Sequence, residues 1–215
     1  MAADVLVVGS TGLIGRAFVE AIRGNDAYRD VIALTRRNIP SLEHAGNIRP
    51  LIIDFQRLED KRNELAAKAV FCALGTTIKK AGSRERFRHV DCQLPLTIAG
   101  LALEQNCRKF ILVSAVGADA GSRIFYNRVK GELERDLRKL PFESIHILRP
   151  SLLMGQRDEY RFGEVLGKIL LQPLRHLLPM KYRPVRANDV ARKALELLDS
   201  DKAGIYVHEG AALSL

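Results

Sequence analysis

Cysteine is scarce in this sequence, and its few positions show no pattern of a disulfide or metal site. The chain of 215 residues has three cysteines, Cys72, Cys92 and Cys107. Their number is odd, and they form neither a CxxC pair nor a cluster with histidine, so neither a disulfide framework nor a zinc site is indicated. We therefore expect reduced thiols that pack in the core, and no metal site.

Long apolar runs are also missing. No segment approaches the roughly 18 apolar residues that a membrane-spanning helix needs. The first residues, MAADVLVVGS, begin a strand directly and lack the basic, apolar and cleavable parts of a signal peptide. The sequence therefore predicts no membrane partner and, by default, a cytoplasmic location.

Internal repeats, low-complexity tracts and Ser/Gly-rich linkers are absent too. Hydrophobic residues make up 47% of the chain and charged residues 27%. This composition is typical of a globular protein with an ample core, and it excludes disordered and fibrous classes. We expect a single domain over residues 1–215. Its least regular part, residues 151–184, contains Pro173, Pro179 and Pro184 and is predicted to form a small cap on the substrate side.

Positive charge is in excess. The formal net charge is +9 and the sequence pI is about 9.7, which favours anionic ligands. Much of the charge lies in residues 79–89, KKAGSRERFRH, and in residues 157–193, which form either a basic rim around a bound anion or solvated loops. Binding to nucleic acid is not expected, because the first segment offers no aromatic platform for bases beyond Phe87.

Seven apolar, β-rich runs are spaced along the chain, and helix-like stretches separate most of them. Several runs are apolar throughout rather than alternating, as in strands that are buried on both faces of a parallel sheet. The expected fold class is therefore α/β with a doubly wound parallel sheet. The runs are VLVVG (5–9), VIALT (31–35), LIIDF (51–55), AVFCALG (69–75), KFILVSA (109–115), SIHILRP (144–150) and GIYVHE (204–209).

Six helices are predicted between these runs: Leu13–Ile22, Leu58–Ala67, Leu96–Asn106, Tyr126–Leu140, Phe162–Leu171 and Asn188–Leu198. Asn188 or Asp189 can cap the last of them. Within the helix over 126–140, Glu134 and Arg138 have the spacing of a solvated ion pair. The five histidines are scattered without metal spacing, and none is assigned a catalytic role.

A glycine-rich turn follows the first run. In VLVVGSTGLIGRAF the glycines stand at 9, 12 and 15, between a predicted strand and a predicted helix. Gly9 permits the tight turn, Gly12 lets the backbone approach a pyrophosphate, and Gly15 lets the helix pack against the strand, as in Rossmann-type sheets. The predicted cofactor contacts here are Gly9, Ser10, Thr11, Gly12, Leu13, Ile14 and Gly15. The alternative is a tight turn without a ligand.

The second run ends in ALTRRN, and this ending bears on the choice of dinucleotide. An acidic residue at this place holds the ribose 2′-hydroxyl of NAD, whereas arginine accommodates the 2′-phosphate of NADP. Here Arg36 and Arg37 supply two permanent cations that bind phosphate well. We therefore predict NADP in preference to NAD, the alternative being a solvated basic loop.

With these features and the runs CALGTTIKKAGSRERFRHVD, FILVSAVGAD, YNRVKGELE and LRPSLLMGQRDE, the chain resembles the short-chain dehydrogenase/reductase superfamily in its extended and atypical branches. It is similar in particular to the small oxidoreductases of the Tat-interacting-protein type. The likeness covers nearly the whole chain. It implies that Asp54 and Phe55 border the adenine, that residues Leu74, Gly75 and Thr76 pass the ribose and phosphates, and that residues from Pro150 to Leu153 border the nicotinamide. Each also has a purely structural alternative, such as capping a turn or ending a strand.

The resemblance also implies a catalytic group. In the superfamily a tyrosine exchanges a proton with the substrate oxygen while hydride moves to or from the nicotinamide, and Tyr126 and Lys130 match its tyrosine and lysine. The four-residue spacing puts both on one helix face, where the ammonium would favour the phenolate and hold the nicotinamide ribose.

A third member of the group is expected at the end of the preceding strand. Ser114 lies there and could hydrogen-bond the substrate oxygen, or it could only satisfy a backbone group. The common superfamily pattern has a second Ser or Thr at the next position, where this chain has Ala115, and often Asn where it has Asp91. Both departures bear on turnover rather than on cofactor binding.

Two functions follow as hypotheses. The first is an NADP(H)-dependent oxidoreductase for a small carbonyl or alcohol, with Tyr126, Lys130 and Ser114 as its catalytic residues. The second is an NADPH-binding regulatory or redox-sensing protein that acts through a protein partner, with little or no turnover. The sequence leaves the substrate, the partner and the oligomeric state open.

Overall fold

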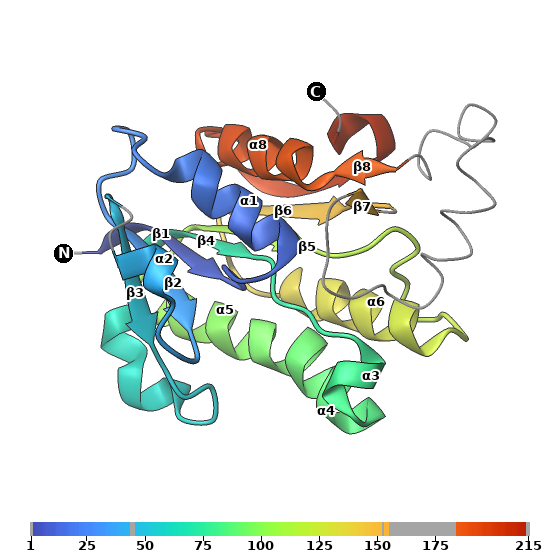
Figure 1. Ribbon diagram of the computed structural model, residues 1–215. Helices are drawn as coiled ribbons and strands as arrows, with labels where there is room; N and C mark the ends of the chain where they lie inside the picture. Colours follow the sequence, from blue (N-terminus) through green and yellow to red (C-terminus); the bar gives the residue numbers. More distant parts are fainter. Residues whose placement is uncertain (1, 44–45, 152, 155–183, 214–215) are drawn as a thin grey trace.

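A seven-stranded parallel sheet forms the centre of the computed structural model, which describes residues 2–43, 46–151, 153–154 and 184–213 (Figure 1). The strand order is β3-β2-β1-β4-β5-β6-β9, so the chain runs outward from β1 in one direction and then from β4 in the other. The strands are β1 (Ala3–Val8), β2 (Val31–Thr35), β3 (Ile48–Ile52), β4 (Ala67–Cys72), β5 (Lys109–Val113), β6 (Ser144–Arg149) and β9 (Gly204–Glu209). This confirms the predicted doubly wound α/β fold.

The strands are apolar throughout because both faces of the sheet are covered. In β1, Val5 and Val7 belong to one buried cluster, whereas Leu6 and Val8 belong to the other. Successive side chains of a strand point to opposite faces. A strand in the middle of such a sheet therefore needs an unbroken apolar run.

Helices cover the two faces in separate layers, which Figure 1 shows above and below the sheet. Buried residues of α1 (Leu13–Ile22) and α8 (Ala187–Leu198) join the cluster on one face. Buried residues of α5 (Leu94–Glu104) and α6 (Phe125–Leu137) join the cluster on the other. Shorter elements are α2 (Pro40–Glu43), α3 (Ile78–Ala81), α4 (Arg84–Arg88), the 3-10 helices η1 (Leu58–Leu65) and η4 (Gly210–Leu213), and the strand pair β7 (Leu153–Met154) with β8 (Val185–Arg186).

Two predicted elements differ clearly from those observed, whereas other bounds shift by up to three residues. The third strand lies at 48–52 rather than at 51–55, and it contains Arg49 and Pro50. Because β3 is an edge strand and partly exposed, it tolerates a charge and a residue without a backbone N–H, and an apolar-run criterion misplaces it. The predicted helix over 58–67 is a 3-10 helix that ends at Leu65, since only Leu58 and Leu65 give it a buried side.

The helix that leads to the candidate site contains a π-helical turn. α4, the π-turn η2 (His89–Gln93) and α5 follow one another without a break. Such wide turns occur mostly as single insertions within α-helices, often at functional sites. Here the turn carries Asp91, whose side chain is fully buried.

The last helix begins without the predicted cap. Its N-cap position is Arg186, and no side chain caps it, while Asp189 instead pairs with Arg192 at 2.5 Å. The predicted helix over 162–171 and most of the predicted cap over 151–184 lie outside the described residues. No described helix has both the length and the apolar character needed to cross a bilayer.

Candidate active site

The predicted site residues gather at one edge of the sheet. Gly9 follows β1, Leu74 lies just beyond β4, Ser114 follows β5 and Pro150 follows β6. All these strands are parallel, so their carboxyl ends meet at this edge. The chain reverses its direction of winding between β1 and β4, and ligands of open α/β sheets bind at such a switch point.

The glycine turn has the geometry expected of a phosphate-binding turn. Gly9 has φ +87°, and a Cβ there would lie 2.7 Å from the carbonyl carbon of Ala73. A Cβ on Gly15 would lie 2.0 Å from the Gly9 oxygen, whereas one on Gly12 would make only an ordinary contact at 3.4 Å. Internal packing therefore explains Gly9 and Gly15 but not Gly12, as expected if Gly12 leaves room for a ligand.

Polar groups around this turn fit an anionic ligand. Within the described residues, the buried hydroxyl oxygens Ser10 Oγ and Thr35 Oγ1 have no hydrogen-bond partner, and unsatisfied buried polar groups are uncommon in folded proteins. The N-cap of α1 is Gly12, and no side chain caps this helix. Its first amides are therefore available to a pyrophosphate, whose charge the helix dipole would stabilise.

The residues predicted to contact the adenosine half lie at the ends of β2 and β3. Arg36 and Arg37 follow β2 directly, and both are exposed. Asp54 follows β3, and its Oδ1 accepts a hydrogen bond from the Gln56 N–H at 2.9 Å, so the turn-capping alternative holds for this oxygen. Phe55 is half-buried beside the core.

A buried ion pair connects the segment after β4 to α6. Lys130 Nζ lies 2.8 Å from Asp91 Oδ1, and the two side chains are 2% and 0% exposed. The second oxygen of Asp91 accepts a hydrogen bond from the Thr76 N–H at 2.8 Å. Asp91 therefore holds together two predicted cofactor contacts, the Leu74–Thr76 segment and Lys130.

Tyr126 lies one helical turn before Lys130, in the first turn of α6. Its ring is half-buried, with its centroid 5.7 Å from that of the buried Phe87. The structure therefore places the tyrosine and the lysine on one helix that borders the carboxyl edge. Because Phe87 is buried, it offers no platform for a nucleic-acid base.

The Ser114 hydroxyl already donates a hydrogen bond within the protein. It donates to Glu134 Oε1 at 2.6 Å, and the Ser114 backbone N–H donates to the Leu148 carbonyl at 2.7 Å. The expectation that Glu134 is solvated is wrong, because this residue is 2% exposed. Arg149 binds both oxygens of Glu134, with Nε at 2.9 Å from Oε1 and an Nη at 2.6 Å from Oε2. Arg138 lies farther from the same carboxylate, at 3.9 Å.

Sequence reasoning missed Glu134 and Arg149 as members of the site. One signal could have found Glu134, because it stands four residues beyond Lys130 and so on the same face of α6. Arg149 gives no comparable signal, since the fold alone brings it to Glu134. Of the residues predicted at the nicotinamide end, Pro150 is buried and its carbonyl accepts from the Val116 N–H at 3.0 Å. The backbone of Leu153 belongs to β7 and pairs with Val185.

The three cysteines are buried and free, as expected of packing thiols. Burial raises the pKa of the Cys72 and Cys107 thiols to about 11, and it also raises the pKa of Cys92. A high thiol pKa disfavours the reactive thiolate.

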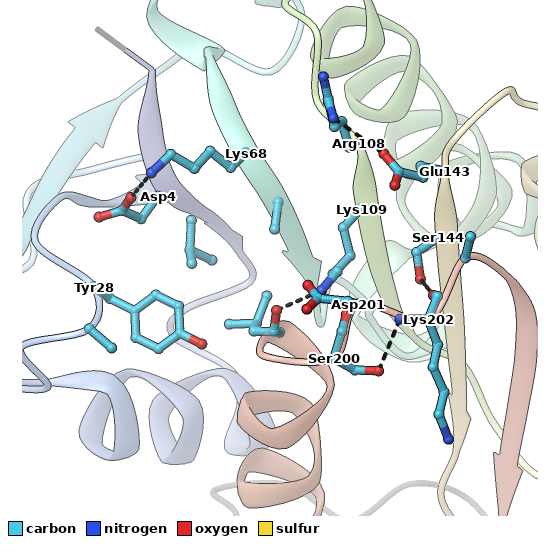
Figure 2. Close-up of a pocket in the computed structure, with 15 residues that line it drawn as sticks. Asp4, Tyr28, Lys68, Arg108, Lys109, Glu143, Ser144, Ser200, Asp201 and Lys202 are labelled. Atoms are coloured by element: carbon cyan, nitrogen blue, oxygen red, sulfur yellow. Dashed lines mark hydrogen bonds and ion pairs between the residues drawn. The ribbon is translucent and has the colours of Figure 1, made fainter.

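A cavity of about 380 Å³ lies at the opposite, amino edge of the sheet (Figure 2). Two of its lysines already bind groups of the protein: Lys68 binds Asp4 at 2.7 Å, and Lys109 Nζ binds carbonyl oxygens at the end of α8 at 2.6 and 3.2 Å. Parallel α/β sheets bind their ligands at the carboxyl edge. We therefore do not assign a ligand to this cavity.

The sheet order and the glycine turn at the switch point define a dinucleotide-binding α/β protein. The chain belongs to the NAD dependent epimerase/dehydratase family, whose profile matches residues 5–127. It is 34% identical over 217 residues to "Protein FMP52, mitochondrial" of Eremothecium gossypii, covering 98% of this chain and 95% of that one. It is also 34% identical over 167 residues to "Protein HTATIP2" of Rattus norvegicus, covering 77% of this chain and 69% of that one. These relatives confirm the predicted resemblance.

A solved structure supports the fold alone. "MoeE5 in complex with UDP-glucose and NAD" matches 95% of this chain and 75% of its own, with a TM-score of 0.70 and 18% identity. The chain therefore has the nicotinamide-dinucleotide-binding, oxidoreductase-type fold of its family.

The comparison with the FMP52 relatives contradicts the expectation of a cytoplasmic location, which is therefore wrong. FMP52 relatives from several fungi carry "mitochondrial" in their names. The expectation depended on the lack of a secretory signal peptide. Mitochondrial targeting uses amphipathic, Arg-rich segments of another composition, so this lack did not bear on it.

Proposed function

We propose that this protein is an NADP(H)-dependent oxidoreductase that acts on a small carbonyl or alcohol. The observation that carries the proposal is the buried pair of Lys130 and Asp91, which joins the tyrosine-bearing helix to the segment after β4. The glycine turn lies at the end of the neighbouring strand β1. The carboxyl edge of the sheet would therefore bind both the pyrophosphate and the nicotinamide end of a dinucleotide.

Each part of this edge has a role in the proposal. The amides at the start of α1, with Ser10 Oγ and the backbone at Gly12, would bind the pyrophosphate. Arg36 and Arg37 would bind the 2′-phosphate with charge-assisted hydrogen bonds. Pro150, with the segment to Leu153, would form the wall beside the nicotinamide.

The reacting groups would lie on α6. A bound NADP(H) supplies the hydride chemistry, and the protein supplies geometry and electrostatics. Tyr126 would exchange a proton between its hydroxyl oxygen and the substrate oxygen. Lys130 would orient the nicotinamide ribose.

A second function is favoured by the same ion pair and by one further contact. Asp91 neutralises the charge of Lys130, and the Ser114 hydroxyl donates its hydrogen bond to Glu134 while Ala115 has no hydroxyl. Both features weaken a catalytic group, while the glycine turn and the two arginines after β2 are left for the cofactor. They support an NADPH-binding regulatory protein that acts through a protein partner, with little or no turnover.

Titration with NADPH and with NADH tests the proposal. We expect saturable binding of both and tighter binding of NADPH, followed by oxidation of NADPH in a screen of small aldehydes and ketones. Failure to bind either dinucleotide would refute both functions. Tight NADPH binding without turnover of any carbonyl would leave the regulatory function in its place.

A further inference from the structure

Four side chains form a polar network beneath the ends of three adjacent strands. We call it the strand-end network, and its members are Ser114 (after β5), Glu134 (on α6), Arg149 (the last residue of β6) and Glu209 (the last residue of β9). Glu134 accepts from Ser114 Oγ and from Arg149, and Arg149 also binds Glu209 Oε1 at 2.6 Å. One buried carboxylate thus connects two strand ends directly and a third through Arg149.

The pairing of Glu134 with Arg149 is strong by its geometry. The guanidinium binds both carboxylate oxygens, an arrangement that adds directional specificity to the charge attraction. The Glu134 side chain is 3% exposed and that of Arg149 is 22% exposed, so water screens the pair weakly. The two carboxylates hold the pKa of Arg149 well above its ordinary value through hydrogen bonds to Glu134 and Glu209.

Backbone hydrogen bonds connect the Glu134–Arg149 pair to the candidate active site. The Ser114 N–H donates to Leu148, and the Val116 N–H donates to the Pro150 carbonyl at 3.0 Å. The alignment of β5 and β6 therefore continues past the last residues of both strands, up to the wall that the proposed function places beside the nicotinamide. Arg149 is the residue directly before that wall.

We propose that Glu134 is a positioning residue of this site: it fixes the ends of β5 and β6, holds Pro150 in place, and accepts the hydrogen bond of the Ser114 hydroxyl. The inference rests on the proposed dinucleotide site. It assigns Ser114 to the support of the site, because its hydroxyl hydrogen is directed at Glu134 and only its lone pairs are left for a substrate.

Two measurements on Glu134→Ala test the proposal, with Glu132→Ala as the matched control. Glu132 lies on the same helix but pairs with Arg88, away from the strand ends. The first measurement is amide hydrogen exchange in the cofactor-free protein. We expect the Ser114 and Val116 amides to exchange about tenfold faster in Glu134→Ala than in the control, because local opening follows the loss of these contacts.

The second measurement compares two ligands. NADPH reaches the nicotinamide wall, whereas adenosine 2′,5′-bisphosphate occupies only the adenine end. We expect Glu134→Ala to weaken NADPH about fivefold and to leave the bisphosphate unchanged. Glu134→Gln keeps the acceptor for Ser114 but loses the charge. Its affinity for NADPH should therefore lie between those of the wild type and of Glu134→Ala. Should Glu134→Ala not fold, Glu134→Gln and Arg149→Lys take its place in both measurements.

The outcomes separate the two proposals. The positioning role of Glu134 is overturned if the Ser114 and Val116 amides exchange as fast in Glu134→Ala as in Glu132→Ala. It is also overturned if Glu134→Ala weakens the binding of NADPH and of the bisphosphate equally. A wild-type protein that binds neither ligand refutes the proposed function instead, and the exchange of Ser114 and Val116 then still decides whether Glu134 fixes the strand ends.

Discussion

Asp91 and Lys130 form an ion pair at 2.8 Å in which neither side chain is more than 2% exposed. Asp91 comes from the π-helical turn between α4 and α5, and Lys130 comes from the middle of α6. The same carboxylate binds the Thr76 N–H. A single residue therefore joins three segments of the chain, and its loss would remove the carboxylate that pairs with a buried cation and accepts from the Thr76 N–H.

Asp91→Ala should destabilise the protein by about 3–5 kcal/mol, because breaking one side of a buried ion pair leaves an uncompensated charge. Urea unfolding monitored by circular dichroism measures the loss. Lys68→Ala is the control, since Lys68 binds Asp4 at a similar distance of 2.7 Å but is 73% exposed. An exposed pair contributes less than about 1 kcal/mol. Equal losses in the two variants would contradict the central structural role of Asp91.

Tyr126→Phe separates the two candidate functions. The ring contact with Phe87 stays, so the variant should fold and should bind NADPH with an affinity within about twofold of wild type. An oxidoreductase should lose about 100-fold or more of its turnover, the usual contribution of a general acid or base. A regulatory protein should keep its function. Lost NADPH affinity in this variant would contradict the assignment of Tyr126 to proton transfer.

Arg36→Ala and Arg37→Ala test the choice of cofactor. A hydrogen bond to a charged group contributes about 1.5–3 kcal/mol, so each variant should bind NADPH at least about tenfold more weakly and NADH unchanged. Isothermal titration measures both constants. Arg62→Ala is the control, because Arg62 is also exposed but lies on η1, 4.0 Å from Glu104. If NADPH and NADH weaken alike, the two arginines do not read the 2′-phosphate.

The sequence predicted most of the sheet because its strands are short apolar runs between turns. The bounds of β2, β9 and α1 agree with the predicted ranges. The edge strand β3 was misplaced, since its partial exposure leaves room for Arg49 and Pro50. The pattern of apolar residues in a segment reflects how that segment is buried, so the pattern is least informative where a segment is half-exposed.

Within the site, local motifs were readable and long-range pairs were not. The glycine turn and the pair Tyr126 and Lys130 are visible because their members stand close together in the chain. Glu134 was assigned to the surface because it and Arg138 have the four-residue spacing of a solvated ion pair on a helix. Its partners Ser114 and Arg149 lie at the ends of β5 and β6, and only the folded sheet brings them together.

Two histidines on adjacent strands form a partly buried chain of polar contacts on the α8 side of the sheet. His146 is 1% exposed, with Nδ1 at 3.1 Å from His208 Nε2 and Nε2 at 3.1 Å from Ser144 Oγ. Burial, assisted by the charges of His208, Lys109 and Lys193, lowers the pKa of His146 from 6.5 to about 4. Burial also lowers the pKa of His208, against a smaller opposing effect of Glu196.

Stability should therefore fall in mild acid. The folded protein keeps His146 neutral, whereas the unfolded chain takes up a proton below pH 6.5, so the contribution of this residue is present above that pH and is lost as the pH falls toward 4. Between pH 7.5 and pH 5 the loss should reach about 2 kcal/mol. Urea unfolding at both pH values measures it. His146→Phe, which keeps a ring against Tyr206, should reduce the difference, and the exposed control His89→Phe should leave it unchanged. An unaltered pH dependence in His146→Phe would show that His146 titrates normally in the fold.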